Sequence, residues 1–258
     1  MRVRKERPAA LAWAVALCVT MLVVYVLTLN ASRPDVVESM AAAPRVTKEI
    51  EFEPLTGWCV SMATCASDQE ARLAASAYSS RGAGGYVAQL DGTWRVIGAV
   101  YESEKDARRI AGRLASEEGI DAEALKLEAE GVKLRITAPQ AQIDAIAGAD
   151  ALLRNETWQL GPVALQLDRG EIRPDGARSL CAVAAEDAAE ASRTLSGIPG
   201  AADNALCAGL IARLDALSEM QSALAASTGD RGATLSGMMR CAQIEGFLGQ
   251  RDLQAGLK

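Results

Sequence analysis

The chain has 258 residues, with 33 acidic and 27 basic side chains and no histidine. A net charge of −6 without a basic stripe argues against a nucleic-acid partner. The lack of histidine removes the commonest general base and metal ligand, and every catalytic arrangement built on them. No glycine-rich loop suits a phosphate, and the pair Glu117-Glu118 is typical of a solvated helix end. Composition therefore predicts a protein that is not an enzyme and holds neither a metal nor a cofactor.

Ala9 to Leu29 form a run of 21 residues without a charge. About 20 apolar residues cross the core of a bilayer as a helix, so this run predicts a transmembrane helix at 9–29. Residues 1–8 carry four basic side chains and one acidic one, whereas Arg33 is the nearest basic residue after the run. Because positive charge is retained on the cytoplasmic side, we expect a single-pass plasma-membrane protein. Its basic tail, residues 1–8, would be cytoplasmic and its bulk extracytoplasmic.

A cleaved signal peptide is the alternative explanation of the same run. The alanines at 41–43 offer small residues for cleavage, but they lie well beyond the end of the run. The run is also longer than the ~7–15-residue apolar core of a signal peptide, which favours an uncleaved anchor. Residues 30–54, which include Pro34 and Pro44, are expected to be a linker.

An internal repeat with an offset of 36 residues follows the linker. Residues 58–72 align with residues 94–108, and both copies open on a tryptophan, continue through a serine and end in Ala-Arg. Only four tryptophans occur in the chain, so the alignment of two of them is hard to ascribe to chance. In each copy, alternating apolar residues predict a strand and the serine, Ser67 or Ser103, predicts the N-cap of a helix.

Two further strands complete this half of the chain. Residues 85–90 form a strand that reaches the second tryptophan through Asp91-Gly92, a hairpin turn, and residues 122–130 form another strand. The order βαββαβ predicts an α+β, ferredoxin-like domain, with a four-stranded antiparallel sheet and two helices on one face. With a last strand at 132–137, we expect this domain to span residues 55–137.

Residues 138–258 are expected to form a helical C-terminal region. Pro139 opens a first helix, and apolar residues at helical spacing predict three more, near 176–195, 206–224 and 233–248. These helices pack together or onto the preceding domain, and their apolar stripes are the best candidate for contact with a protein partner. The cysteines beyond the apolar run form no CxxC pair, so we expect buried thiols rather than a zinc site.

The repeat resembles a known family. Each copy has a strand that starts with an aromatic residue and contains valine, followed by Ser-x-x-x-Ala. The segments Gly82-Ala-Gly-Gly-Tyr86 and Asp91-Gly-Thr-Trp-Arg-Val-Ile-Gly-Ala-Val-Tyr101 are similar to the middle of such domains. Over about residues 55–130 the chain resembles the sporulation-related repeat (SPOR) domain, in the membrane-anchored version of spore-forming Gram-positive bacteria.

This resemblance implies a non-catalytic module that binds peptidoglycan glycan strands stripped of their stem peptides, during sporulation or cell division. In the family the strand lies across the sheet face that the helices leave open. The glycan-binding residues that the resemblance implies here are Ser61, Ala63, Gln89, Arg95, Ile97 and Ala99.

Two of these positions depart from the family, which often has glutamine where Ser61 stands and glycine where Ala63 stands. The alternative function is a degenerate SPOR-like domain that acts as a structural or protein-interaction module and recruits an envelope partner. In that case Arg95 is a solvated charge, and Trp58 and Trp94 fill the core between sheet and helices.

Overall fold

A computed structural model describes residues 44–228 and 232–257 of the chain. The chain divides into two units, Met1–Ala43 and Pro44–Lys258, and the description below concerns the second. The predicted transmembrane helix at 9–29 and the basic tail at 1–8 lie outside the described residues. Within 44–228 and 232–257, no helix combines the length and the apolar character that crossing a membrane requires.

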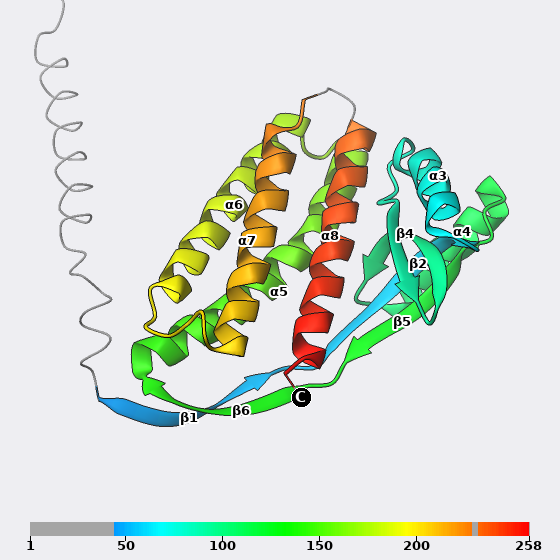
Figure 1. Ribbon diagram of the computed structural model, residues 1–258. Helices are drawn as coiled ribbons and strands as arrows, with labels where there is room; N and C mark the ends of the chain where they lie inside the picture. Colours follow the sequence, from blue (N-terminus) through cyan, green and yellow to red (C-terminus); the bar gives the residue numbers. More distant parts are fainter. Residues whose placement is uncertain (1–43, 229–231, 258) are drawn as a thin grey trace, which may run out of the picture. The chain divides into compact units, whose positions relative to one another are not determined.

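The described residues form two antiparallel sheets and six helices (Figure 1). The sheets come first in the chain, and the long helices follow them. The strands are β1 (Arg45–Phe52), β2 (Leu55–Cys65), β3 (Tyr86–Leu90), β4 (Thr93–Tyr101), β5 (Glu123–Ala129) and β6 (Val132–Pro139). The helices are α3 (Asp68–Ser79), α4 (Glu104–Glu118), α5 (Gln140–Asp168), α6 (Pro174–Ser196), α7 (Ala205–Ala226) and α8 (Gly232–Ala255).

The larger sheet has the strand order β3-β4-β2-β5, so the two strands that contain Trp58 and Trp94 are direct neighbours. The predicted N-caps are confirmed: Ser67 Oγ accepts from the Glu70 amide at 3.2 Å and Ser103 Oγ from the Asp106 amide at 3.4 Å. Helices α3 and α4 bury small residues against one face of this sheet, where Val60 and Val96 are fully buried. Small helix residues allow this close approach of helix and sheet.

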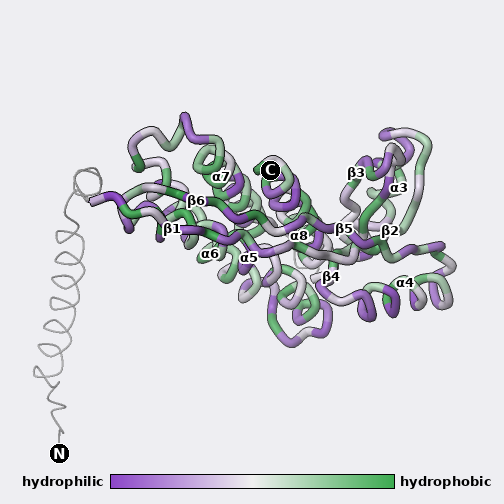
Figure 2. Tube along the Cα trace, turned by 90° about the horizontal axis from the view of Figure 1, so that it is seen from below, coloured by the Kyte–Doolittle hydropathy of each residue, from purple (hydrophilic) through white to green (hydrophobic). Residues whose placement is uncertain are grey.

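The smaller sheet pairs β1 with β6 and continues the β2–β5 pairing without a change of register. Leu55 pairs with Ala129 and Phe52 pairs with Val132, which is the same register across the gap. Pro54 lies in the gap, and a proline has no amide hydrogen to donate to a ladder. The two strand pairs therefore form one long ribbon with a single interruption, and Figures 1 and 2 show β1 and β6 running on into β2 and β5.

Side chains of the helices satisfy the backbone carbonyls at this interruption. Gln254 Nε2 of α8 donates to the carbonyl of Glu53 at 2.6 Å and to that of Phe52 at 3.3 Å. Arg154 Nη2 of α5 also donates to the carbonyl of Glu53, at 2.5 Å. Without these donors, the carbonyls would be left unpaired where the ladder stops. At the break in the ribbon, α5 and α8 are therefore hydrogen-bonded to its backbone.

Replacing Gln254 by alanine is expected to lower the free energy of unfolding by about 1–3 kcal/mol, because the buried carbonyl of Phe52 loses its side-chain donor and that of Glu53 keeps only Arg154. Gln254 is 3% exposed, so water does not replace the amide freely. Urea denaturation of the two proteins measures the difference. The control is Gln166→Ala on the exposed side of α5, with an expected change within about 0.5 kcal/mol. Equal effects of the two substitutions would contradict the role given to Gln254.

Helix α8 packs on the face of the larger sheet opposite α3 and α4. Phe247 and Ile244 of α8 are fully buried in one cluster with Leu55, Cys59 and Ile97 of the sheet. Helix α5 packs along α8, and α6 packs along α7, which completes the helical layer (Figure 1). The sheet therefore has helices on both faces.

The predicted fold class is wrong in the part of the chain that the structure describes, where one ferredoxin-like domain with a single sheet and a following helical region were expected. The described residues have two antiparallel sheets, and α8 shares a core with the larger one. The expected linker at 30–54 contributes β1, whose partner β6 was predicted as a last strand of the domain at 55–137, without a partner. The C-terminal helices cover a face that was expected to be open, because the apolar stripe of α8 and the apolar face of the sheet exclude water from each other.

Candidate functional site

Three of the six residues predicted to bind glycan lie on the sheet face that α8 covers. Ser61 pairs with Ile97 across β2 and β4, and Arg95 lies two residues before Ile97 on the same strand. Ser61 is 2% exposed and Ile97 is fully buried beneath α8. Arg95 lies beyond this cluster and forms an ion pair with Glu123 of β5, at 2.8 Å. Ser61 and Ile97 are therefore inaccessible to a polymer.

The structure does not bring the other three predicted residues to that face. The pairing of β2 with β4 shifts at Ser61 and again before Ala63, which is a β-bulge. An extra residue turns the following side chains to the opposite face of a sheet, so Ala63 packs beside Trp94 below α3. Ala99 pairs with Val60 on the side of α3 and α4.

Gln89 lies at the end of β3 and is exposed. It pairs with Trp94, and its side-chain amide donates to the carbonyl of Gly92 at 3.5 Å, across the hairpin turn. Its side chain belongs to the turn and not to a surface shared with the other predicted residues.

A cleft of about 440 Å³ opens on the side of the sheet that carries α3 and α4. Its floor is formed by Val60, Met62 and Gly98 of the sheet, and by Ala99. Helices α3 and α4 form its walls, and the end of α5 and the side chain of Arg240 from α8 close it. We call it the arginine cleft, because its lining includes Arg81, Arg109, Arg113, Arg169 and Arg240.

The charge of the arginine cleft is opposite to that of the whole chain. Its lining includes five arginines and only two carboxylates, Glu118 and Asp168, whereas the whole chain carries a net charge of −6. Arg109 and Arg113 occupy neighbouring turns of α4 and keep 61% and 55% of their side chains exposed. A guanidinium has five N–H donors in a planar fork, which suits carboxylates. The cleft therefore presents donors to an anion above an apolar floor.

The ion pairs of these arginines leave them able to bind a ligand. Arg109 contacts Asp106 at 3.0 Å and Arg113 contacts Glu117 at 3.8 Å, both on the helix surface. Exposed pairs of this kind are worth about 0–1 kcal/mol, so an anionic ligand can compete for the same donors. Arg240 differs: it is 17% exposed and donates to the carbonyl of Gly82 at 2.5 Å, besides its ion pair with Asp168.

Tyr101, the last residue of β4, lies where three arginines of the cleft converge. Burial raises the pKa of its hydroxyl, and the positive charges of Arg240, Arg109 and Arg113 oppose that rise. The hydroxyl is therefore protonated at neutral pH and is a hydrogen-bond donor beside the guanidinium groups.

A second compartment of about 360 Å³ adjoins the arginine cleft and shares Ala99, Tyr101, Arg109, Leu165 and Arg240 with it. Trp158 and Pro162 of α5 line its other side. The second compartment adds the carboxylates of Glu102 and Asp106, so the two compartments together are lined by five arginines and four acidic residues, besides aromatic and apolar side chains.

Comparisons with protein-family models, with curated proteins and with solved structures find no match to this chain.

The thiols of Cys59 and Cys181 are buried, and burial raises their pKa to about 12 and about 11. Thiolates are the reactive form, so neither cysteine is an activated nucleophile. Within the described part of the chain, no three acidic or cysteine side chains are grouped to hold a metal ion.

Sequence analysis did not identify the arginine cleft. Arg109 and Arg113 are four residues apart in a predicted helix, and this spacing was the available signal. Arg81, Arg169 and Arg240 lie in three distant segments, and only the packing of α5 and α8 against the sheet brings them together.

Proposed function

We propose that this chain is a non-catalytic cell-envelope protein that binds peptidoglycan glycan strands in the arginine cleft. The proposal combines the SPOR-like repeat at about 55–130 with the predicted plasma-membrane anchor at 9–29. It moves the binding site from the sheet face below α8 to the opposite side of the same sheet.

The chemistry of a stripped glycan strand suits the arginine cleft. Hydrolysis of the amide that joins the stem peptide to the sugar leaves a free carboxylate on every second sugar. Arginine binds carboxylates through paired N–H groups, and aromatic side chains such as Tyr101 pack against the apolar faces of sugars. An intact strand lacks these carboxylates, so this chemistry favours glycan without stem peptides.

The observation that carries the proposal is the concentration of five arginines around one cleft in an acidic chain. Each of them has a carboxylate partner within the chain, but the pairs of Arg109 and Arg113 are exposed. An anionic polymer can therefore compete for the donors of these two arginines.

The double substitution Arg109→Gln, Arg113→Gln is expected to lower binding to amidase-treated sacculi at least tenfold. Each glutamine keeps a polar side chain on α4 but removes a charged donor from the cleft. The measurement is co-sedimentation of the full chain in detergent with purified sacculi, before and after amidase treatment. Binding of the unsubstituted chain should rise after the treatment and fall with added salt.

The matched control is Arg72→Gln, Arg108→Gln. These arginines are 71% and 70% exposed on α3 and α4, form the same kind of helix ion pair, and do not line the cleft. Their replacement should leave binding within twofold. Equal losses for the two double variants would show non-specific attraction by positive charge and reject the cleft as the site.

The second candidate function is a protein-interaction module of the envelope. It is favoured by Leu180 and Val183 of α6, which are 52% and 60% exposed on one stretch of helix. Absence of sacculus binding under every treatment would leave this candidate in place of the first.

A further inference from the structure

A buried glutamine of α8, Gln243, borders the second compartment beside the arginine cleft. It is 3% exposed, and within the described residues its side-chain amide has no hydrogen-bond partner. A Cβ atom at Gly161 of α5, which lines the same compartment, would lie 2.8 Å from Gln243 Nε2 and 3.0 Å from its Oε1. The amide end of the side chain, and not only its stem, therefore lies at the wall of the compartment.

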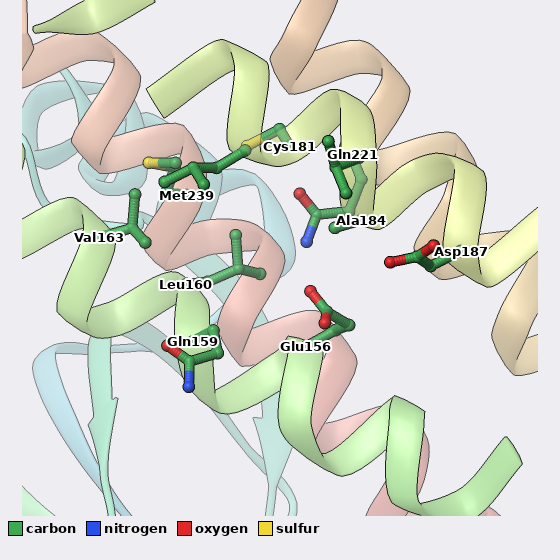
Figure 3. Close-up of a pocket in the computed structure, with 11 residues that line it drawn as sticks. Glu156, Gln159, Leu160, Val163, Cys181, Ala184, Asp187, Gln221 and Met239 are labelled. Carbon is green, nitrogen blue, oxygen red and sulfur yellow. The ribbon is translucent and has the colours of Figure 1, made fainter. Parts of the chain in front are cut away.

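A second buried glutamine shows the contrast. Gln221 of α7 lines a separate pocket of about 280 Å³ between α5 and α6 (Figure 3). It is 2% exposed, and its unpartnered Oε1 atom is enclosed by protein atoms, so that oxygen has no surface to offer a ligand. The amide atoms of Gln243 are not enclosed in this way, and a group inside the compartment can reach them. An unpaired buried amide costs about 1–3 kcal/mol, which a ligand that pairs with it recovers.

The charges that line this compartment are balanced, unlike those of the arginine cleft. Two arginines, Arg109 and Arg240, and two carboxylates, Glu102 and Asp106, line it. The carboxylates oppose an anion and the guanidinium groups oppose a cation. The compartment therefore favours a neutral group that has both donors and acceptors.

The aromatic wall and the size of the compartment suit one sugar residue. Trp158 of α5 lines it and packs on Phe247, with ring centroids 5.6 Å apart, so the indole is held in place. An indole presents a rigid apolar surface to the apolar face of a sugar, and carboxylates accept hydrogen bonds from sugar hydroxyls. The volume of about 360 Å³ is at the small end of ligand sites, which span about 300–1,000 Å³.

We propose that this compartment is the subsite for a neutral sugar that carries an acetamido group. The inference rests on the proposed function, because in a stripped strand the sugars without a carboxylate alternate with those that have one. The arginine cleft takes the charged sugar and the adjoining compartment takes its neutral neighbour. Gln243 Oε1 accepts from the acetamido N–H, and the Tyr101 hydroxyl, which lines the same compartment, donates to the acetamido carbonyl.

The probe is the trimer of N-acetylglucosamine, which has no carboxylate. It is compared with cellotriose, which has a hydroxyl in place of each acetamido group. Isothermal titration calorimetry of the full chain, in a detergent without a sugar headgroup, measures both after correction for protein-free micelles. We expect the trimer to bind with a dissociation constant on the order of 1 mM, and cellotriose at least tenfold more weakly. A hydroxyl lacks the carbonyl acceptor and the methyl group of the acetamide.

Two variants assign the binding to Gln243. Gln243→Met keeps the length of the side chain and removes the amide, so it should weaken trimer binding at least fivefold. It should not lower the melting temperature, since no hydrogen bond within the described residues is lost. Gly161→Ala places a methyl group where the amide lies and should weaken trimer binding as well. The matched control is Gln159→Met, with binding unchanged within twofold, because Gln159 is exposed on α5 and lines the other pocket (Figure 3).

Equal affinity for the trimer and cellotriose would overturn the inference, because the acetamido group would then not be recognised. No binding of either sugar would overturn it too, and so would equal losses in Gln243→Met and Gln159→Met. Sacculus binding that falls with the loss of Arg109 and Arg113 but is unchanged in Gln243→Met would reject this subsite and leave the proposed function in place. Trimer binding that depends on Gln243, without any binding to sacculi, would support the subsite and reject the proposed function.

Discussion

Replacing Phe247 by alanine is expected to lower the free energy of unfolding by about 3–5 kcal/mol. The ring is fully buried where α8 crosses the larger sheet, against Leu55, Cys59 and Ile97. It also packs on Trp158 of α5, with ring centroids 5.6 Å apart and planes tilted by 55°. The sheet and α5 are held by separate contacts, so they cannot close over the space the ring leaves. Urea denaturation followed by circular dichroism measures the loss.

The control for this substitution is Met238→Ala on the same helix. Met238 is 39% exposed, so the loss of its side chain leaves no closed cavity, and we expect a change within about 1 kcal/mol. A small effect of Phe247→Ala, similar to that of Met238→Ala, would show that α8 does not cover the sheet. The face that includes Ser61 and Ile97 would then be open to solvent, and the glycan site predicted from the sequence could lie on that face.

Local signals in the sequence were sufficient for the elements of the larger sheet. The serines of the repeat cap α3 and α4, because the residue before a helix needs a side-chain acceptor for the free amides of the first turn. Asp91 and Gly92 have φ angles of 50° and 76°, and these positive values explain why Asp-Gly forms the tight turn between β3 and β4. Each of these predictions needs only residues a few positions apart.

Long-range features could not be predicted in the same way. The strand β1 lies in the segment expected to be a linker, and its pairing with β6 joins residues 45–52 to residues 132–139. No residue pattern within either segment indicates which other segment it pairs with. The bulge at Ser61 is also invisible in the alternation of β2, yet it moves Ala63 to the opposite face. Two register shifts, one on each strand, separate Ala63 and Ala99 from Ser61 and Ile97.

The position of α8 could not be predicted, because an apolar helical stripe does not identify what it packs against. The sequence predicts a helix that packs with the other helices or onto the preceding domain, and it does not decide between the two. In the structure that stripe is shared between the sheet, through Phe247, and α5, through Met239. The covered face and the arginine cleft are consequences of the same packing, since Arg240 reaches the cleft from α8.

Replacing Gly237 by alanine is expected to lower the free energy of unfolding by about 1–3 kcal/mol, because α8 passes close to the backbone after α3. A Cβ atom at Gly237 would lie 2.9 Å from the carbonyl oxygen of Ala83 and 3.2 Å from that of Ser79. Backbone atoms cannot turn aside as the end of a flexible side chain can. The substitution must therefore shift α8 away from the segment that leads into β3, against the higher helix propensity of alanine.

Gly112→Ala in α4 is the matched control for Gly237→Ala. Both glycines lie inside helices, but a Cβ atom at Gly112 would have no neighbour within 4 Å. Alanine at Gly112 should therefore raise the free energy of unfolding by about 0.5–1 kcal/mol, the ordinary gain from replacing a helical glycine. The two substitutions differ only in what surrounds the added methyl group, so opposite signs in urea denaturation report the contact of α8 directly. Stabilisation by both would mean that α8 and the segment after α3 are further apart than the structure places them, and Arg240 would then no longer reach the arginine cleft.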